Sequence, residues 1–286
     1  MCDDLTAEDN RLSRREVGIA LGAAGLAALL PSPADAVPVA GRAVSIATAD
    51  GTADAFFVAP TKGRHPAVLV WPDIMGLRPA FEQMARRLAE SGYAVLVVNQ
   101  FYRSVKAPFL APGESFDQPA VRDRITPWRA ALTPAATSAD GRAFVEWLDR
   151  QKEVDPRRPI GSSGYCMGGP MTIRTAAARP DRVRAVASFH GGGLVGDAPD
   201  GPDKLVARTK AGALIAVAQN DDARRPQDKD VLRAAYVAAK LPAEIEVYPA
   251  DHGWCPPDSR AYDRAQAERA WSRQLALFAK HLGARA

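Results

Sequence analysis

A cysteine lies in a stretch of this chain whose residue types and spacing suit covalent catalysis. The segment Gly164-Tyr165-Cys166-Met167-Gly168 has the pattern glycine, any residue, nucleophile, any residue, glycine, between an apolar strand and a helix of small residues at 168–178. Glycines let a strand and a helix pass closely through a sharp turn, and the first helical amides then face the sulfur and favour its thiolate. The pattern predicts a nucleophilic thiol at Cys166. A buried structural cysteine in a tight turn is the alternative.

A nucleophile of this kind needs a base, and the sequence contains four histidines. His252 lies between the last predicted strand and the last predicted helix, where hydrolases with this turn place their histidine. We therefore expect His252 to be the base. His190, which follows another strand and leads into three glycines, is the alternative. His65 and His281 are expected in a surface loop and at the end of a helix.

The base in turn needs a carboxylate that orients its ring. The apolar run 214–218 leads through Gln219 and Asn220 to Asp221 and Asp222, near the end of the strand that precedes the histidine strand. Because successive side chains leave a strand in opposite directions, only one of the two carboxylates is expected to reach His252. We expect Asp221 to be that residue, with Asp222 as the alternative.

The loop Trp71-Pro72-Asp73-Ile74-Met75-Gly76-Leu77 follows the first long buried strand. A loop in this place is expected to supply the second donor to an oxyanion, so the amide of Ile74 is predicted to act with that of Met167. Asp73 is unusual there, because a carboxylate near a thiol opposes formation of the thiolate. The alternative is that Asp73 caps or closes a turn.

The elements that must position these residues alternate between strand and helix. Near-continuous apolar runs predict strands buried on both faces, and 3.6-residue periodicity predicts the helices. Predicted strands occupy 41–46, 54–58, 67–71, 93–98, 159–163, 185–189, 212–218 and 245–248, and predicted helices occupy 79–90, 140–151, 168–178, 227–240 and 262–282. The order predicts an α/β fold in one domain, with a mostly parallel, doubly wound sheet flanked by helices. Residues 100–137, rich in Pro and Gly, are expected to form an irregular lid or binding loop.

These motifs resemble those of the dienelactone hydrolase family. The resemblance covers residues 44–282 and depends on Gly164-Tyr165-Cys166-Met167-Gly168-Gly169, Asp73-Ile74-Met75-Gly76 and His252-Gly253-Trp254. It implies the α/β-hydrolase fold and a Cys-His-Asp triad. It also implies that Asp73, in place of the glutamate usual in the family, modulates the thiol by holding it neutral until substrate binds.

The resemblance further implies basic residues that hold a substrate carboxylate. Tyr102 and Arg103 match one such position and are the expected substrate-binding residues. A second arginine is expected shortly after the histidine, but this sequence has Cys255-Pro256-Pro257 there, and Arg260 is the nearest arginine. Cys255 is expected either to line the site or to be packed.

Together, the residues and the resemblance predict hydrolysis of a carboxylic ester or lactone through a thioester intermediate. A non-hydrolytic ligand-binding or thiol protein on the same scaffold is the alternative. The sequence has no metal-ligand cluster, Walker loop or dinucleotide fingerprint, so neither a metal nor a cofactor is expected. A net charge of +4 over 286 residues, without a basic block, argues against a nucleic-acid partner. We expect a small-molecule substrate and a monomer.

Residues 1–36 are predicted to be a signal peptide and residues 37–286 the single domain. Ser13-Arg14-Arg15-Glu16-Val17 is a twin-arginine pattern, followed by the apolar run 18–30 and the cleavage pattern Ala34-Asp35-Ala36. These features resemble a Tat export signal, so the precursor is expected to engage the Tat machinery and the protein to be periplasmic or secreted. Loss of the leader, with its three arginines and six acidic residues, raises the net charge from +4 to +7.

Overall fold

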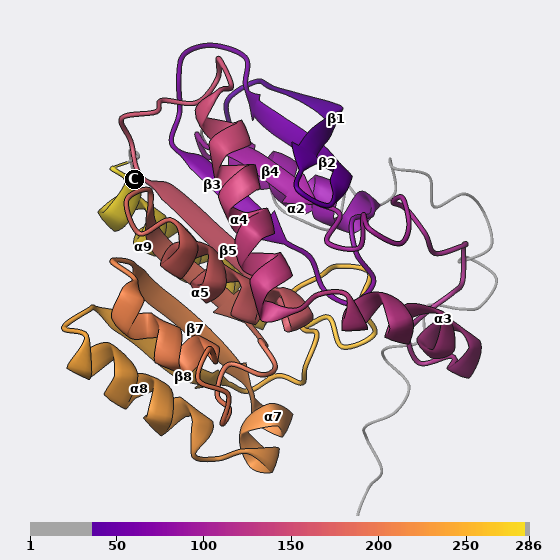
Figure 1. The fold of residues 1–286 in the computed structure, drawn as a ribbon, viewed down its shortest axis with the longest axis vertical. Coiled ribbons are helices and arrows are strands. Elements are labelled where there is room, and N and C mark those ends of the chain that lie inside the picture. Colours follow the sequence, from indigo (N-terminus) through magenta and orange to yellow (C-terminus); the bar gives the residue numbers. More distant parts are fainter. Residues whose placement is uncertain (1–35, 284–286) are drawn as a thin grey trace, which may run out of the picture.

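The computed structural model describes residues 36–283, which contain one eight-stranded sheet with helices on both faces (Figure 1). The predicted signal peptide lies almost entirely outside these residues. Within them, no helix is long and apolar enough to cross a membrane.

Only β2 runs against the direction of the other strands in this sheet. The strand order is β1-β2-β4-β3-β5-β6-β7-β8, and both the β1–β2 and β2–β4 pairs are antiparallel. The strands are β1 (Val39–Thr48), β2 (Gly51–Pro60), β3 (Ala67–Trp71), β4 (Ala94–Val98), β5 (Ile160–Tyr165), β6 (Val183–Phe189), β7 (Gly212–Ala218) and β8 (Ala243–Tyr248). The predicted α/β-hydrolase class is confirmed, with a first hairpin longer at both ends than predicted.

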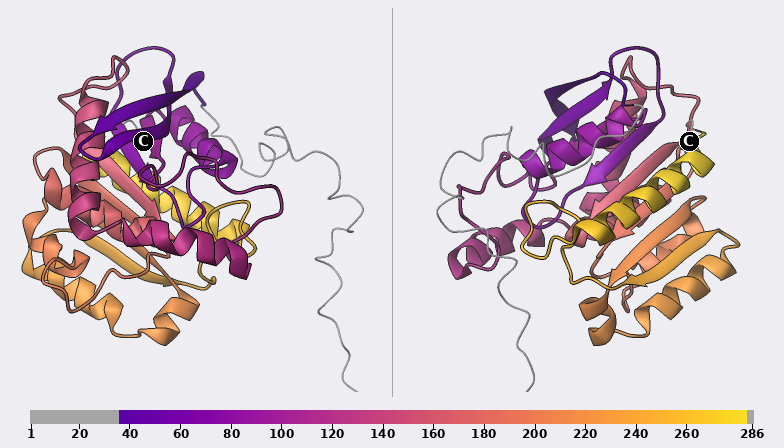
Figure 2. Two further views of the ribbon diagram at one scale, coloured as in Figure 1. Left: turned by 45° about the vertical axis from the view of Figure 1, so that its right-hand side comes forward. Right: turned by 180° about the vertical axis from the view of Figure 1, so that it is seen from behind.

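The helices form a layer on each side of the sheet (Figure 2). Helices α4, α5 and α8 contribute to one hydrophobic core and helices α2 and α9 to the other. The helices are α2 (Pro79–Glu90), α3 (Pro119–Ala130), α4 (Pro134–Asp149), α5 (Gly169–Ala178), α6 (Pro202–Leu205), α7 (Gln219–Arg224), α8 (Asp228–Ala238) and α9 (Arg264–Leu282), with 3₁₀ turns η1 (Cys166–Gly168) and η2 (Val206–Arg208). Strands β3 and β4 are buried throughout, as expected for apolar strands covered on both faces.

Residues 100–137 are more regular than predicted. They contain α3 and the start of α4, and each of these helices has proline at its first position. Proline fits there because the first helical amides have no partner within the helix, so the prolines that suggested irregular structure instead begin helices. Phe101, Val121 and Ile125 form a small third core, against which Ile74 and Met167 pack. This segment therefore covers the carboxyl ends of the central strands.

Candidate active site

Cys166 occupies the sharp turn between β5 and α5, and its backbone is left-handed with φ 51°. A Cβ atom added to Gly164 would lie 2.2 Å from the carbonyl oxygen of Gly168. One added to Gly168 would lie 2.2 Å from the carbonyl oxygen of Trp71 on β3. Any side chain at either glycine would therefore collide with backbone. The two glycines are required by this turn, which holds a half-buried thiol at the end of the sheet.

His252 lies next to this thiol and is oriented by Asp221. Its Nδ1 is 2.5 Å from Oδ2 of Asp221, and its ring also interacts with the side chain of Cys166. The amide of His252 donates to Oδ1 of Asn220 at 2.9 Å, which ties the histidine loop to the start of α7. Asp222 points elsewhere, because its Oδ1 accepts from Nζ of Lys229 at 2.6 Å. Of the two candidate carboxylates, Asp221 is the one that the fold brings to the histidine.

The charge state of His252 depends on both neighbours. Burial lowers its pKa, but hydrogen bonds and charge interactions with Asp221 and Cys166 outweigh burial and raise the pKa from 6.5 to about 10. Because the pKa in the folded protein exceeds the usual value, protonated His252 stabilises the fold fully below about pH 6.5. That contribution is lost as the pH rises toward 10. The site therefore favours an imidazolium beside the sulfur at neutral pH.

We expect NMR titration of the His252 ring to show an imidazolium that persists through neutral pH and loses its proton near pH 10. In Cys166→Ala, the pKa of His252 should fall, because two of the interactions that raise it are gone. Asp221 should continue to raise the pKa of His252 in this variant, against the lowering effect of burial. An unchanged pKa in this variant would show that the sulfur does not interact with the ring.

His190, the alternative base, contacts the same turn in a different way. Its Nδ1 accepts a hydrogen bond from the backbone amide of Cys166 at 3.2 Å, and its ring centroid lies 5.0 Å from that of His252. Its side chain is fully buried, and burial lowers its pKa well below 6.5. Since His252 has both the carboxylate and the contact with the thiol, the geometry favours His252 as the base.

Asp73 belongs to a buried charge network. Its carboxylate accepts two hydrogen bonds from Arg78, at 2.7 and 2.9 Å, and one from the amide of Met75 at 2.9 Å. Arg78 also donates twice to Asp258, beyond the histidine. The turn contact with Met75 matches the alternative interpretation of Asp73, and its role toward the thiol stays a prediction. The network joins the predicted oxyanion loop to the loop that follows His252.

A cavity of about 650 Å³ opens beside the thiol. It is bounded by the histidine, by both predicted oxyanion donors and by residues of α3, α4 and α5. The lining residues are Ile74, Phe116, Arg129, Leu132, Pro134, Thr137, Cys166, Met167, Pro170, Met171, Arg174, Gly192, Gly193 and His252. The triad and oxyanion residues predicted from sequence therefore lie together at this cavity, or directly behind it in the case of Asp221.

The predicted substrate-binding pair lies outside this lining. The hydroxyl of Tyr102 donates to Asp140, and Arg103 forms salt bridges with Asp140 and Asp50. Arg260, the other candidate, is exposed and pairs with Asp117. No feature of the sequence near these residues indicates Asp140, which lies on α4 and binds both of them outside the cavity.

Arg129 and Arg174 are the two arginines that line the cavity instead. Arg174 is half-buried on α5 and donates to the backbone oxygen of Asp200 at 2.9 Å. Among residues 36–283, no carboxylate forms a salt bridge with Arg174. Burial lowers the pKa of Arg174, while the charge of Asp200 raises it. Arg174 follows Pro170 by one helical turn and Cys166 by two. This spacing in the sequence indicates that Arg174 lies on the same face as the nucleophile.

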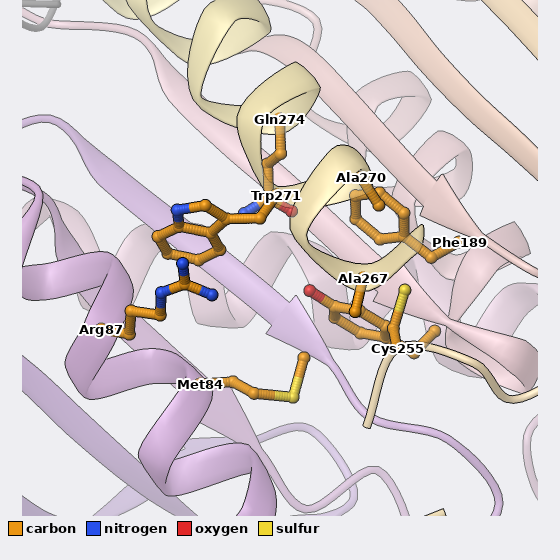
Figure 3. Close-up of a pocket in the computed structure, with 9 residues that line it drawn as sticks. Met84, Arg87, Phe189, Cys255, Ala267, Ala270, Trp271 and Gln274 are labelled. Carbon is orange, nitrogen blue, oxygen red and sulfur yellow. The ribbon is translucent and has the colours of Figure 1, made fainter. Parts of the chain in front are cut away.

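Cys255 is packed away from the thiol at Cys166. It lies behind the sheet in a separate cavity of about 30 Å³, with Met84, Arg87, Phe189 and Trp271 (Figure 3). Both cysteines are free, and burial raises the pKa of Cys255 well above 9.0. This result agrees with the packed alternative for Cys255. Throughout residues 36–283, no three His, Cys, Asp or Glu side chains are grouped so as to hold a metal ion.

The model of the dienelactone hydrolase family matches residues 53–282 of this chain. The chain belongs to the dienelactone hydrolase family. It is accordingly a hydrolase of carboxylic esters or lactones, and the family resemblance of the motifs is confirmed.

Relatives in this family match most of the chain. An Escherichia coli K12 protein with the provisional name carboxymethylenebutenolidase is 28% identical over 276 residues, 94% of this chain and 97% of that protein. Carboxymethylenebutenolidase of Rhodococcus opacus is 26% identical over 226 residues, 77% of this chain and 83% of that protein. A Klebsiella pneumoniae protein of known crystal structure, provisionally described as a dienelactone hydrolase, is 26% identical in sequence to this chain. The two structures match with a TM-score of 0.73 over 85% of this chain and 100% of the Klebsiella chain.

Proposed function

We propose that this protein hydrolyses its ester or lactone substrate through Cys166, His252 and Asp221. The observation that carries the proposal is the continuous contact from the Cys166 thiol through the His252 ring to the Asp221 carboxylate, at the turn between β5 and α5. A non-hydrolytic role requires no such contact, and family membership also favours hydrolysis.

In the first half-reaction, the Cys166 thiolate attacks the substrate carbonyl carbon, a C–S bond forms, and the carbonyl electron pair moves onto oxygen. The amides of Ile74 and Met167 stabilise this oxyanion. When the intermediate collapses, the C–O bond breaks, and the His252 imidazolium gives its proton to the leaving alkoxide. The product of this step is a thioester on Cys166.

In the second half-reaction, neutral His252 takes a proton from water, which attacks the thioester carbonyl. The C–S bond then breaks and the acid product leaves, so that thiolate and imidazolium are restored. Asp221 holds the ring with Nε2 toward the sulfur and stabilises the imidazolium in both halves.

The lining of the cavity suits a substrate that carries a carboxylate. Arg174 is a half-buried guanidinium with one hydrogen bond to a backbone oxygen, so most of its donors remain for a ligand. Bidentate pairing with a carboxylate suits its planar geometry. The name of the Rhodococcus relative also denotes an acidic lactone. We therefore propose that Arg174 takes the place predicted for Arg103, with Arg129 at the rim.

The test of the function is hydrolysis of a panel of short p-nitrophenyl esters and a small lactone, combined with rapid acid quench and mass spectrometry. Turnover and an acyl adduct on Cys166 are expected. An adduct that is absent during fast turnover would contradict the thioester. Failure of every ester and lactone to react, together with tight binding of one of them, would favour the non-hydrolytic alternative.

Replacement of Arg174 by glutamine should distinguish anionic from neutral substrates. We expect kcat/KM for p-nitrophenyl hemisuccinate to fall by about tenfold or more, because a charge-assisted hydrogen bond contributes on the order of 1.5–3 kcal/mol. The rate for neutral p-nitrophenyl butyrate should stay within about twofold of wild type. Arg103→Gln is the matched control, since Arg103 lies outside the cavity, and an equal loss on both esters would contradict the assignment.

A further inference from the structure

The loop at 190–193, which follows β6, holds both backbone polar groups of Cys166. The amide of Cys166 donates to Nδ1 of His190 at 3.2 Å, and the amide of Gly192 donates to the carbonyl oxygen of Cys166 at 3.4 Å. The loop approaches the turn so closely that a Cβ atom on Gly169 would lie 2.7 Å from Cα of Gly191.

These bonds matter because the backbone at Cys166 is strained. A left-handed φ of 51° is unfavourable for cysteine, and such a conformation persists only where surrounding contacts fix it. His190 is itself left-handed, with φ 41°, and its amide donates to Ala216 on β7 at 2.8 Å. The strained cysteine is thus held by a second strained residue that is attached to the neighbouring strand.

The hydrogen bond also determines the proton on the His190 ring. Because the Cys166 amide is the donor, Nδ1 must be unprotonated, and a neutral ring carries its hydrogen on Nε2. The ring is buried, lies edge to face on Trp254 at 4.9 Å, and within residues 36–283 has no hydrogen-bond partner for Nε2. The His252 ring lies 5.0 Å away and the Tyr165 ring 6.2 Å away. A second cation beside His252 is therefore disfavoured, and burial lowers the pKa of His190 accordingly.

We propose that His190 is a positioning residue, which holds Cys166 in its left-handed conformation by accepting the cysteine amide at Nδ1. It does not touch the reacting atoms, and its contribution to catalysis rests on the proposed role of Cys166 as nucleophile. The bond also commits the Cys166 amide to His190, which leaves the oxyanion to the amides of Met167 and Ile74.

The first test uses the wild-type protein. Long-range ¹H–¹⁵N NMR at pH 7, with the His190 signals assigned by their through-space contacts with the Trp254 ring 4.9 Å away, should show a neutral ring with hydrogen on Nε2 and an unprotonated Nδ1. A ring with hydrogen on Nδ1, or an imidazolium, would overturn the proposal. This measurement uses only the wild-type protein, so it stays decisive if the variants fail to fold. It also does not depend on turnover, so it stays decisive if Cys166→Ala proves active and the proposed function fails.

The second test separates the acceptor from the backbone conformation. His190→Gly and His190→Asn both tolerate a positive φ, but only asparagine offers an oxygen near the position of Nδ1. We expect His190→Gly to lower kcat on p-nitrophenyl butyrate by about tenfold or more, with KM within about twofold, and to slow alkylation of Cys166 by iodoacetamide. His190→Asn should recover most of both rates. Wild-type rates in His190→Gly, or equal losses in the two variants, would rule out the acceptor role.

Discussion

Replacement of Cys166 by alanine is expected to reduce kcat/KM on p-nitrophenyl butyrate on the order of 10⁴-fold or more, because the variant has no atom that can form the thioester. The fold should be retained, since the side chain is only half-buried and the substitution removes a single sulfur atom. Stopped-flow hydrolysis and a thermal melt of the same preparation measure the two quantities together. Full turnover in Cys166→Ala would exclude the cysteine mechanism.

Two further variants make this result specific. Cys255→Ser changes the other free thiol, which lies in a separate cavity behind the sheet, so kcat should stay within about twofold of wild type. Cys166→Ser keeps a nucleophilic atom, but its hydroxyl does not form an ion pair with His252 as readily as a thiol, so we expect a rate well below wild type. If Cys255→Ser were instead the inactive variant, the assignment of the nucleophile would be wrong.

The sequence predicted those parts of the site that are set by local geometry. The turn at Cys166 needs glycines wherever a strand enters a helix this sharply, and His252 and Asp221 follow the ends of adjacent parallel strands, which meet at one edge of the sheet. Chain order and strand ends are visible in a sequence. Counting along the strand favours Asp221 over Asp222, although the structure places both on the short helix α7.

The sequence could not predict contacts that depend on packing between distant segments. The family resemblance implies that Arg103 binds the substrate, and nothing nearby in the sequence indicates that Asp140 pairs with it instead. Similarly, the position of His190 after a strand makes it a second candidate base. Its bond to the Cys166 amide cannot be predicted, because that bond exists only once β5 and β6 lie side by side. The prolines of this segment suggest a loop, so the sequence does not predict helix α3, although its first proline occupies a favourable helical position.

Replacement of Asp221 by asparagine should show how much of the activity depends on the charge behind the histidine. We expect kcat to fall by about 10³- to 10⁴-fold, a range that follows from the same change in serine hydrolases. The asparagine amide can donate to Nδ1, which would leave the hydrogen on Nε2 and present the wrong tautomer to the sulfur. The pKa of His252 should fall as well, since a hydrogen bond and a charge that raise it are lost.

Asp222→Asn is the matched control for this variant, because Asp222 is adjacent in sequence, carries the same charge and pairs with Lys229. Its kcat should stay within about twofold of wild type, with an unchanged pKa for His252. The opposite result, a slow Asp222→Asn beside an active Asp221→Asn, would transfer the orienting role to Asp222. In a third outcome, both variants are slow but the pKa of His252 falls only in Asp221→Asn. Asp222 would then act by placing α7, because its bond to Lys229 joins α7 to α8. The pKa of the ring therefore separates a carboxylate that orients the histidine from one that supports the helix beside it.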